Sequence, residues 1–288
     1  MCQHFRGKLI AHALADLMHT LHKAGALTRW YESVTGLPRY SLPDKTFGIY
    51  LKGAMPAHAR RQQFRQLCPG SAHWIDHPLY EALSPQHSAW TVLFDLIDDG
   101  RPRLENGARL FKQVPSGAVD VDLAIVLMVI RNEDNHDDRL RVQCCRFLPT
   151  LLAVACHLTP LGYVSHELLD LINDTIEVDH SGHWWNEGWP ETYAELDALI
   201  ALWGKWIGIA RQLHLVTTDQ SAATFSRLVQ NLSPYKRHSL IICLSTAVDE
   251  HRSIFHYANL RRLYHALRRH PPFVVKVGYP PVPSQLVD

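Results

Sequence analysis

Histidines, carboxylates and tryptophans gather in one segment of the chain, residues 178–190, which reads VDHSGHWWNEGWP. Imidazole nitrogens and carboxylate oxygens can bind zinc or another divalent ion, and this segment supplies four of them: Asp179, His180, His183 and Glu187. The spacing differs from the His-Glu-x-x-His pattern of helix-borne zinc proteases. The neighbouring indoles could form a ligand platform or fill a gap between helical layers: Trp184, Trp185 and Trp189. The 179–187 loop is therefore an alternative metal or ligand site, and we predict no metal ion for the main function.

A second histidine lies beside acidic residues, in the turn Asn135-His136-Asp137-Asp138. The His136-Asp137 pair resembles the dyad of HD-type metal-dependent phosphohydrolases. That resemblance implies an earlier histidine and a later aspartate, for which His87 and Asp179 are the candidates. The competing interpretation, a solvated acidic turn between apolar helices, is the one we favour. A metal-dependent hydrolase using His136/Asp137 or the 179–187 loop therefore stays an alternative.

Other catalytic signatures are missing from the sequence. It contains no Gly-x-x-x-x-Gly-Lys-[Ser/Thr] phosphate loop, no Gly-x-Gly-x-x-Gly and no Gly-x-Ser-x-Gly nucleophile elbow. We therefore expect neither nucleotide hydrolysis nor α/β-hydrolase chemistry. The prediction is a protein without catalytic residues or a cofactor.

Basic residues cluster between positions 39 and 65. This segment holds six Lys or Arg residues and a single acid, Asp44. Clustered cations displace the counterions around nucleic-acid phosphates and so produce binding without any base contact. We predict nucleic-acid-binding residues here, some of which would have to reach a groove edge: Lys45, Thr46, Ile49, Lys52, Arg60 and Arg61. A solvated basic face on an ordinary helical hairpin is the alternative.

The order of elements in this region resembles the helix-turn-helix of phage-repressor-like (Xre-type) regulators. A short helix over 27–34 ends at Thr35-Gly36, a loop follows, and a second helix over 44–51 precedes Gly53-Ala54-Met55-Pro56. The resemblance implies that the 44–51 helix enters the major groove, although the turn over 36–43 is longer than usual. Residues 69–79 (PGSAHWIDHPL) also look like segments of uncharacterised bacterial proteins from prophage-like and mobile-element neighbourhoods.

The helical period gives the 44–51 helix two faces. At about 100° per residue, Phe47, Tyr50 and Leu51 should pack on the preceding helices. Lys45, Thr46 and Ile49 should then lie toward solvent. We expect Asp44 or Ser41 to cap the helix.

Charge is distributed unevenly along the 288 residues. Residues 1–85 hold 10 Lys or Arg against 5 acids, residues 86–210 hold 9 against 19, and residues 211–288 hold 10 against 4. A second basic surface is predicted near the C-terminus, in the helix containing Arg261, Arg262, Arg268 and Arg269. We predict a basic helical domain over 1–85, a helical domain with an acidic middle over 86–270, and a proline-rich extended tail over 271–288.

Apolar residues recur mainly at spacings of three and four, which is the helical period. A first helix should run from Ile10 toward Gly25, a buried helix should span 119–130, and a helix over 139–158 should kink or break at Pro149. Ser233-Pro234 predicts the start of another helix. No alternating strand pairs joined by Asn-Gly or Asp-Gly turns occur. The predicted fold class is all-α.

These features together predict a cytoplasmic, nucleic-acid-binding regulatory or accessory protein. The nucleic acid is expected to be DNA, and the larger C-terminal domain would mediate homo-oligomerisation or contacts with a protein partner. A helical protein–protein interaction module, in which the basic ends dock on the acidic middle, is the alternative. No apolar run approaches the length of a membrane span, so no membrane partner is expected.

Overall fold

The computed structural model describes residues 2–43, 45–84, 118–131, 138–179, 188–249 and 258–269. These residues form helices joined by turns and loops, and none of them lies in a strand. The all-α fold class is confirmed. Several predictions fall outside the described residues: the Asp44 cap, His87, the His136-Asp137 pair, most of the 179–187 loop and the 271–288 tail.

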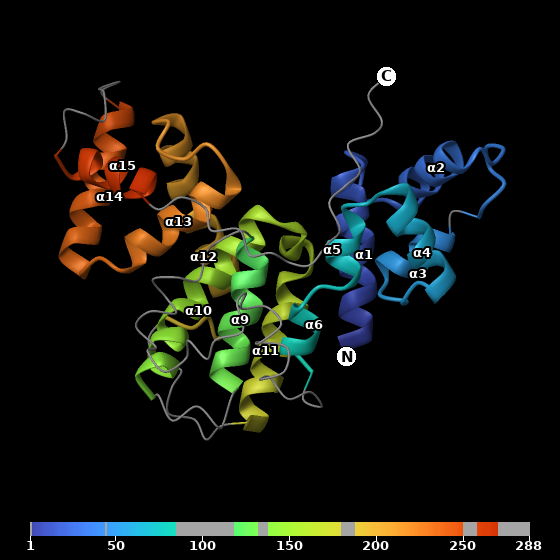
Figure 1. The fold of residues 1–288 in the computed structure, drawn as a ribbon, viewed down its shortest axis with the longest axis horizontal. Coiled ribbons are helices and arrows are strands. Elements are labelled where there is room, and N and C mark those ends of the chain that lie inside the picture. The colour runs from blue at the N-terminus through green and yellow to red at the C-terminus, as the bar shows by residue number, and fades with distance from the viewer. Residues whose placement is uncertain are drawn as a thin grey trace.

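The N-terminal helices lie together at one end of the molecule (Figure 1). They are α1 (Cys2–Leu17), α2 (Ala24–Thr35), α3 (Lys45–Leu51), α4 (His58–Leu67), α5 (Ser71–Ile75) and α6 (Leu79–Ala82). One face of α1 packs with α2 to α5 around a small aromatic core that includes Tyr31, Phe47 and Phe64. Phe47 and Phe64 are fully buried there.

A larger core is built around α9 (Val119–Arg131), a helix in which every residue is buried. The surrounding helices are α10 (Asp138–Leu158), the 3-10 helix η2 (Pro160–Val164), α11 (Ser165–Asp179) and α12 (Tyr193–Gln212). Helices α13 (Asp219–Gln230), α14 (Pro234–Asp249) and α15 (Ala258–Arg269) lie at the opposite end of the molecule from α2–α4 (Figure 1). A mainly apolar helix that is buried on all sides, as α9 is, is typical of the centre of a bundle.

The larger core takes residues from both sides of position 85. The other face of α1 contributes Phe5 and Leu9, and the α5–α6 segment contributes Trp74, Leu79 and Leu83. The N-terminal helices therefore have a core of their own and also contribute to the larger core around α9. We call helices α9 to α15 the body of the molecule. A division of the chain at residue 85 stays a prediction.

Helix boundaries agree with the sequence where a clear signal exists. Helix α2 ends at Thr35, followed by Gly36 in the left-handed conformation with φ 69°, and α14 begins at Pro234. Of the kink or break predicted at Pro149, the break does not occur, because α10 continues through that residue, and the kink stays a prediction.

The prediction for the end of the first helix is wrong. Helix α1 ends at Leu17, and Gly25 lies inside α2. His19 adopts the left-handed conformation with φ 49°, and the Thr20 N–H donates to the Ala15 carbonyl at 2.9 Å. This bond closes the helix in the way that usually accompanies a glycine after the C-terminus. Because a histidine occupies that position here, the end of the helix had no signal in the sequence.

No single helix among the described residues is long and apolar enough to cross a membrane. One pair of segments, Cys144–Leu158 and Pro160–Ile176, meets the length and composition test jointly and is bent by 104°.

Candidate functional site

Helix α3 presents one exposed face and one buried face, as predicted. Phe47 is 0 % exposed and Tyr50 is 9 % exposed, whereas Ile49 is 49 % exposed. Lys45 and Lys52 are also exposed. Lys52 directly follows α3, and its N–H still donates to the Gly48 carbonyl at 3.2 Å, so positions 45, 49 and 52, spaced by four and three, continue one side of the helix. We call Lys45, Ile49 and Lys52 the α3 surface.

Phe47 and Tyr50 of α3 pack with Tyr31 of α2 and Phe64 of α4 in a cluster of four aromatic rings. The Phe47 ring lies 5.8 Å from that of Tyr31, 5.8 Å from that of Tyr50 and 6.1 Å from that of Phe64, measured between centroids. The guanidinium of Arg60 lies over the outer side of the cluster, 4.6 Å from the Tyr31 ring centroid. Such ring pairs are worth about 0.5–1.5 kcal/mol beyond the area they bury, so this short helix is anchored firmly.

The long turn before α3 is organised by one carboxylate that the sequence analysis did not single out. Glu32 is 2 % exposed, and its side chain accepts hydrogen bonds from the Leu42 N–H at 2.9 Å and the Tyr40 N–H at 3.1 Å. The Ser41 hydroxyl donates a third bond, at 3.4 Å. The Leu42 amide is the main reason why the pKa of Glu32 lies below its ordinary value, although burial opposes this shift. The turn over 36–43 is therefore long but fixed.

The step after α3 is also fixed, by close packing on α1. Gly53 has φ 100°, a conformation that favours glycine, and a Cβ on Gly7 would lie 2.5 Å from the Gly53 carbonyl oxygen. The predicted Gly53-Ala54-Met55-Pro56 step thus lies where α1 and the end of α3 nearly touch.

The other three residues predicted to bind nucleic acid are Thr46, Arg60 and Arg61, and the two arginines contact neighbouring residues of the fold. Thr46 is half-buried at the edge of the α3 surface. Arg60 and Arg61 are half-buried, and Arg61 donates to the Pro56 carbonyl at 2.9 Å. Arg60 stacks on Tyr31 as described above. The structure therefore brings Lys45, Ile49 and Lys52 together as a surface, while Arg60 and Arg61 stabilise the helices behind it.

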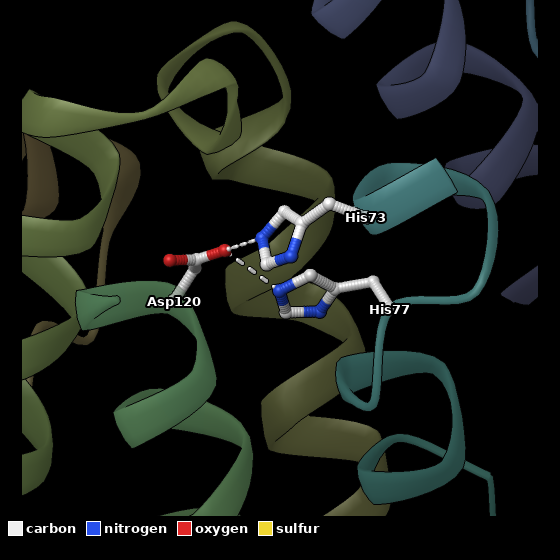
Figure 2. Close-up of side chains that lie close together, drawn as sticks. All are labelled: His73, His77 and Asp120. Carbon is white, nitrogen blue, oxygen red and sulfur yellow. Dashed lines mark hydrogen bonds and ion pairs between the residues drawn. The ribbon is translucent and has the colours of Figure 1, made fainter. Parts of the chain in front are cut away.

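A second site, unpredicted, lies where α5 and α6 meet α9. Nε2 of His73 lies 2.5 Å and Nε2 of His77 lies 2.8 Å from the same carboxylate oxygen, Oδ2 of Asp120 (Figure 2). The side chains of His77 and Asp120 are 0 % and 4 % exposed, while that of His73 is 28 % exposed. We call these three residues the histidine–aspartate cluster. Nitrogen and oxygen donors of this kind could hold a metal ion.

His77 has a defined tautomer in this cluster. The Leu79 N–H donates to Nδ1 of His77 at 3.1 Å. In the neutral ring the proton must then sit on Nε2, from which it is donated to Asp120. Burial lowers the pKa of His77, although the bond to Asp120 opposes that effect. His77 thus joins the first turn of α6 to the first turn of α9.

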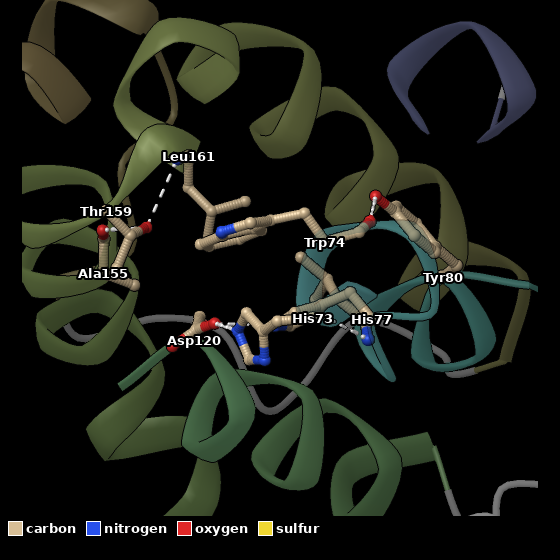
Figure 3. Close-up of polar contacts among 9 residues, drawn as sticks. His73, Trp74, His77, Tyr80, Asp120, Ala155, Thr159 and Leu161 are labelled. Carbon is tan, nitrogen blue, oxygen red and sulfur yellow. Dashed lines mark hydrogen bonds and ion pairs between the residues drawn. The ribbon is translucent and has the colours of Figure 1, made fainter. Parts of the chain in front are cut away.

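The pKa of Asp120 is lowered although its side chain is buried. Burial raises its pKa, but the hydrogen bonds from His73 and His77 outweigh burial and hold the pKa of Asp120 well below its ordinary value. The indole of Trp74 stacks on the His77 ring at 5.2 Å and 9°. Figure 3 shows the indole on the side of the imidazoles toward Leu161 and Thr159. The Tyr80 hydroxyl donates to the Trp74 carbonyl at 2.6 Å and secures the segment further.

Asp122, two residues further along α9, has the opposite electrostatics. It is 9 % exposed, and its Oδ1 finds no hydrogen-bond partner among the described residues. Burial raises the pKa of Asp122 to about 8, and the charge of Arg227 on α13 opposes that rise. Within one turn of helix, the pKa of Asp120 is therefore lowered and that of Asp122 is raised.

A third polar group connects α1 with η2. Nδ1 of His12 lies 2.9 Å from Nδ1 of His22, and Nε2 of His22 lies 2.8 Å from Oδ1 of Asp16. Both imidazoles stack on the Tyr163 ring, with centroids 4.9 Å and 3.9 Å away. Burial, and then repulsion from His22, lowers the pKa of His12 to about 4. His12 is therefore neutral at physiological pH, and the group serves as a contact between the N-terminal helices and the body.

The sequence contained a partial signal for the histidine–aspartate cluster. His73 and His77 are four positions apart, a spacing that places side chains on one side of a helix. Their acidic partner lies 43 residues beyond His77, inside an apolar segment that predicts only a buried helix. No periodicity connects the two.

Comparisons with protein-family models, with curated proteins and with solved structures found no match to this chain.

Proposed function

We propose that the N-terminal helices bind nucleic acid, preferably DNA, through the α3 surface. The observation that carries this proposal is the position of Lys45, Ile49 and Lys52 on one exposed side of a helix whose other side is anchored by Phe47. Because Phe47 anchors the packed side of the helix, the exposed side chains can contact a ligand without unfolding the helix. The role proposed for the whole chain is that of a regulatory or accessory protein without catalysis.

The local charge favours an anionic partner. No ion pair involving Lys45 or Lys52 is recorded within the described part of the chain. Arg39, on the loop that leads into α3, is exposed as well. The acid of α2 on this side, Glu32, is buried under the loop and satisfied by the hydrogen bonds described above. Among the described residues the exposed charges on α3 and its loop are therefore basic, and Glu32 is hidden beneath that loop.

The chemistry of the α3 surface sets what it can recognise. Two ammonium groups would contact phosphates, which position a protein on nucleic acid without reading sequence. In this proposal the hydroxyl of the half-buried Thr46 would bond to a base edge, and the exposed Ile49 would make an apolar contact such as that with the thymine methyl. A helix of seven residues offers few such contacts, so we expect weak sequence preference.

The body of the molecule has a separate role in this proposal. Helix α15 buries Leu260 and Leu263 and exposes Arg261 and Arg262. This second basic surface lies at the end of the molecule opposite α3 (Figure 1). We assign α9–α15 to oligomerisation or to binding a protein partner in the cytoplasm, separately from the contact that the α3 surface would make.

The proposal is tested by binding of the full chain to a fluorescent DNA duplex of about 20 base pairs at about 50 mM and about 200 mM salt. The Lys45→Ala/Lys52→Ala variant should bind at least about tenfold more weakly at low salt. Its plot of log affinity against log salt should be less steep by about 1.8, since each lost phosphate contact contributes about 0.9. Lys205→Ala/Lys236→Ala is the matched control, because it removes the same charge from exposed positions on α12 and α14.

Equal losses in the two double variants would show a general charge effect and contradict the proposal. So would an absence of binding by the wild-type chain at low salt. Single-stranded DNA and RNA of the same length, measured in parallel, identify the preferred form of nucleic acid.

A further inference from the structure

The histidine–aspartate cluster has a donor set that a transition metal would accept. It combines two imidazoles with one carboxylate, and the three candidate ligand atoms lie within 4.8 Å of one another. Among the described residues no other group of three or more His, Cys, Asp or Glu side chains meets this condition. From this convergence we propose that His73, His77 and Asp120 bind one divalent transition-metal ion, for which zinc is the best match.

The position of the three residues supports a built site. Asp120 lies in the first turn of the fully buried helix α9, and the two histidines come from the α5–α6 segment on the opposite side (Figure 2). The Asp120 side chain is only 4 % exposed, and a carboxylate buried in this way is expensive unless positive charge or several donors face it. His73 is the only partly exposed member, so an ion would enter from its side and water would complete the coordination.

The choice of ion follows from the donors. Imidazole nitrogen together with carboxylate oxygen suits zinc, and three protein ligands plus water is the arrangement of open zinc sites. Calcium and magnesium prefer sets made of oxygen alone. Apolar and aromatic neighbours surround the cluster, with Trp74 stacked on His77, and they would limit the number of waters.

Binding of an ion would change two contacts of the histidine–aspartate cluster. Donors on one tetrahedral zinc ion, each at about 2.1 Å, lie about 3.4 Å apart. Nε2 of His73 and Nε2 of His77 lie 2.5 Å and 2.8 Å from Oδ2 of Asp120, so both imidazoles must move away from that oxygen to admit the ion. An ion on Nε2 of His77 also replaces the proton there, and the proton on Nδ1 would then oppose the Leu79 N–H. That contact must open, so binding is coupled to a small shift at the first turn of α6.

The test uses the full chain without an affinity tag, treated with EDTA, incubated with zinc chloride and desalted. Zinc per chain is measured by mass spectrometry, and the dissociation constant by calorimetry. The wild-type chain should retain one ion. His73→Ala and Asp120→Asn should each bind zinc at least about tenfold more weakly. His58→Ala and His238→Ala remove exposed histidines elsewhere and should leave binding unchanged.

Trp74 assigns the ion to this place. Its indole contacts both imidazoles, with centroids 4.8 Å from His73 and 5.2 Å from His77. Zinc should therefore change the tryptophan fluorescence of the wild-type chain. Trp74→Phe should abolish that change while the chain still retains zinc.

Three results would overturn the proposal. The wild-type chain would retain no zinc, or His73→Ala would retain as much as the wild type, or a control histidine variant would lose the ion instead. His73→Ala decides the matter even if Asp120→Asn fails to fold, because His73 is partly exposed and circular dichroism can establish that this variant folds. If any of these three results is found, the cluster is a set of hydrogen bonds that joins α5 and α6 to α9 without a metal ion. DNA binding by Lys45 and Lys52 does not enter any of these outcomes.

Discussion

The α3 surface and the first turn of α9 both concentrate charge, and they do so in opposite surroundings. Lys45 and Lys52 lie in water on a helix whose apolar side is packed. Asp120 and Asp122 lie inside the molecule, where each needs a partner or a proton. The first arrangement separates folding from binding, because the cations contribute little to the fold. The second couples charge to folding.

That difference determines what mutations can reveal. Removing a water-exposed cation changes long-range attraction and leaves packing intact. Removing a buried charge alters desolvation, hydrogen bonding and protonation together. Substitutions in the first turn of α9 should therefore change mainly the free energy of unfolding, and substitutions on the α3 surface mainly the affinity for nucleic acid. The packed side of α3 is an exception, because substitutions there should also change the free energy of unfolding.

The largest effect is expected on that packed side. Phe47→Ala removes a fully buried ring that contacts three aromatic neighbours, and it should lower the free energy of unfolding by about 3–5 kcal/mol. Denaturant titration followed by circular dichroism measures this change. Ile49→Ala, on the exposed side of the same helix, should cost less than about 1 kcal/mol. Similar losses in the two variants would mean that α3 is not anchored through Phe47.

Asp122 offers the next test, through pH. Its pKa of about 8 in the folded chain lies above the ordinary value, so the folded state holds a proton that the unfolded state releases near pH 4. The contribution of Asp122 to stability is complete below that pH and is lost as pH rises toward 8. Asp122→Asn cannot titrate, so its stability relative to the wild type should increase with pH, by at most about 1.4 kcal/mol per unit.

The measurement is denaturant unfolding of both proteins at pH 5, 6 and 7. A difference between the two that is independent of pH would show that Asp122 is ionised in the fold. Taking the difference matters, because the lowered pKa of His12 acts in the opposite direction in both proteins.

The sequence predicted those parts of the fold that depend on local patterns. Apolar spacing predicts the helices, and the same spacing places Phe47 inside and Ile49 outside, as the structure confirms. Gly36 and Pro234 mark helix ends through backbone conformation alone. The end of α1 was missed because His19 adopts the left-handed conformation that glycine usually signals.

The candidate sites needed information that no local pattern carries. Glu32 looks like an ordinary helix-surface acid until the loop over 36–43 folds back on it. Asp120 looks like an acid at a helix start, and only the packing of α5 and α6 on α9 brings it to His73 and His77. The sequence also contained no sign that Arg60 stacks on Tyr31 or that Arg61 donates to the Pro56 carbonyl. Contact of these two arginines with nucleic acid stays a prediction.

The smallest effect on stability should come with a clear effect on binding. Lys45 is exposed and precedes the packed residues of α3, so Lys45→Ala should change the free energy of unfolding by no more than about 0.5 kcal/mol. The same variant should bind DNA more weakly, and the slope of log affinity against log salt should fall by about 0.9, the share of one phosphate contact.

Lys205→Ala is the single-site control, with an unchanged slope expected. If Lys45→Ala instead destabilises the chain while DNA affinity stays constant, then Lys45 supports the fold and the α3 surface does not bind nucleic acid. Such a result would place charge at α3 in the same category as charge at α9, where it cannot be removed without disturbing the fold.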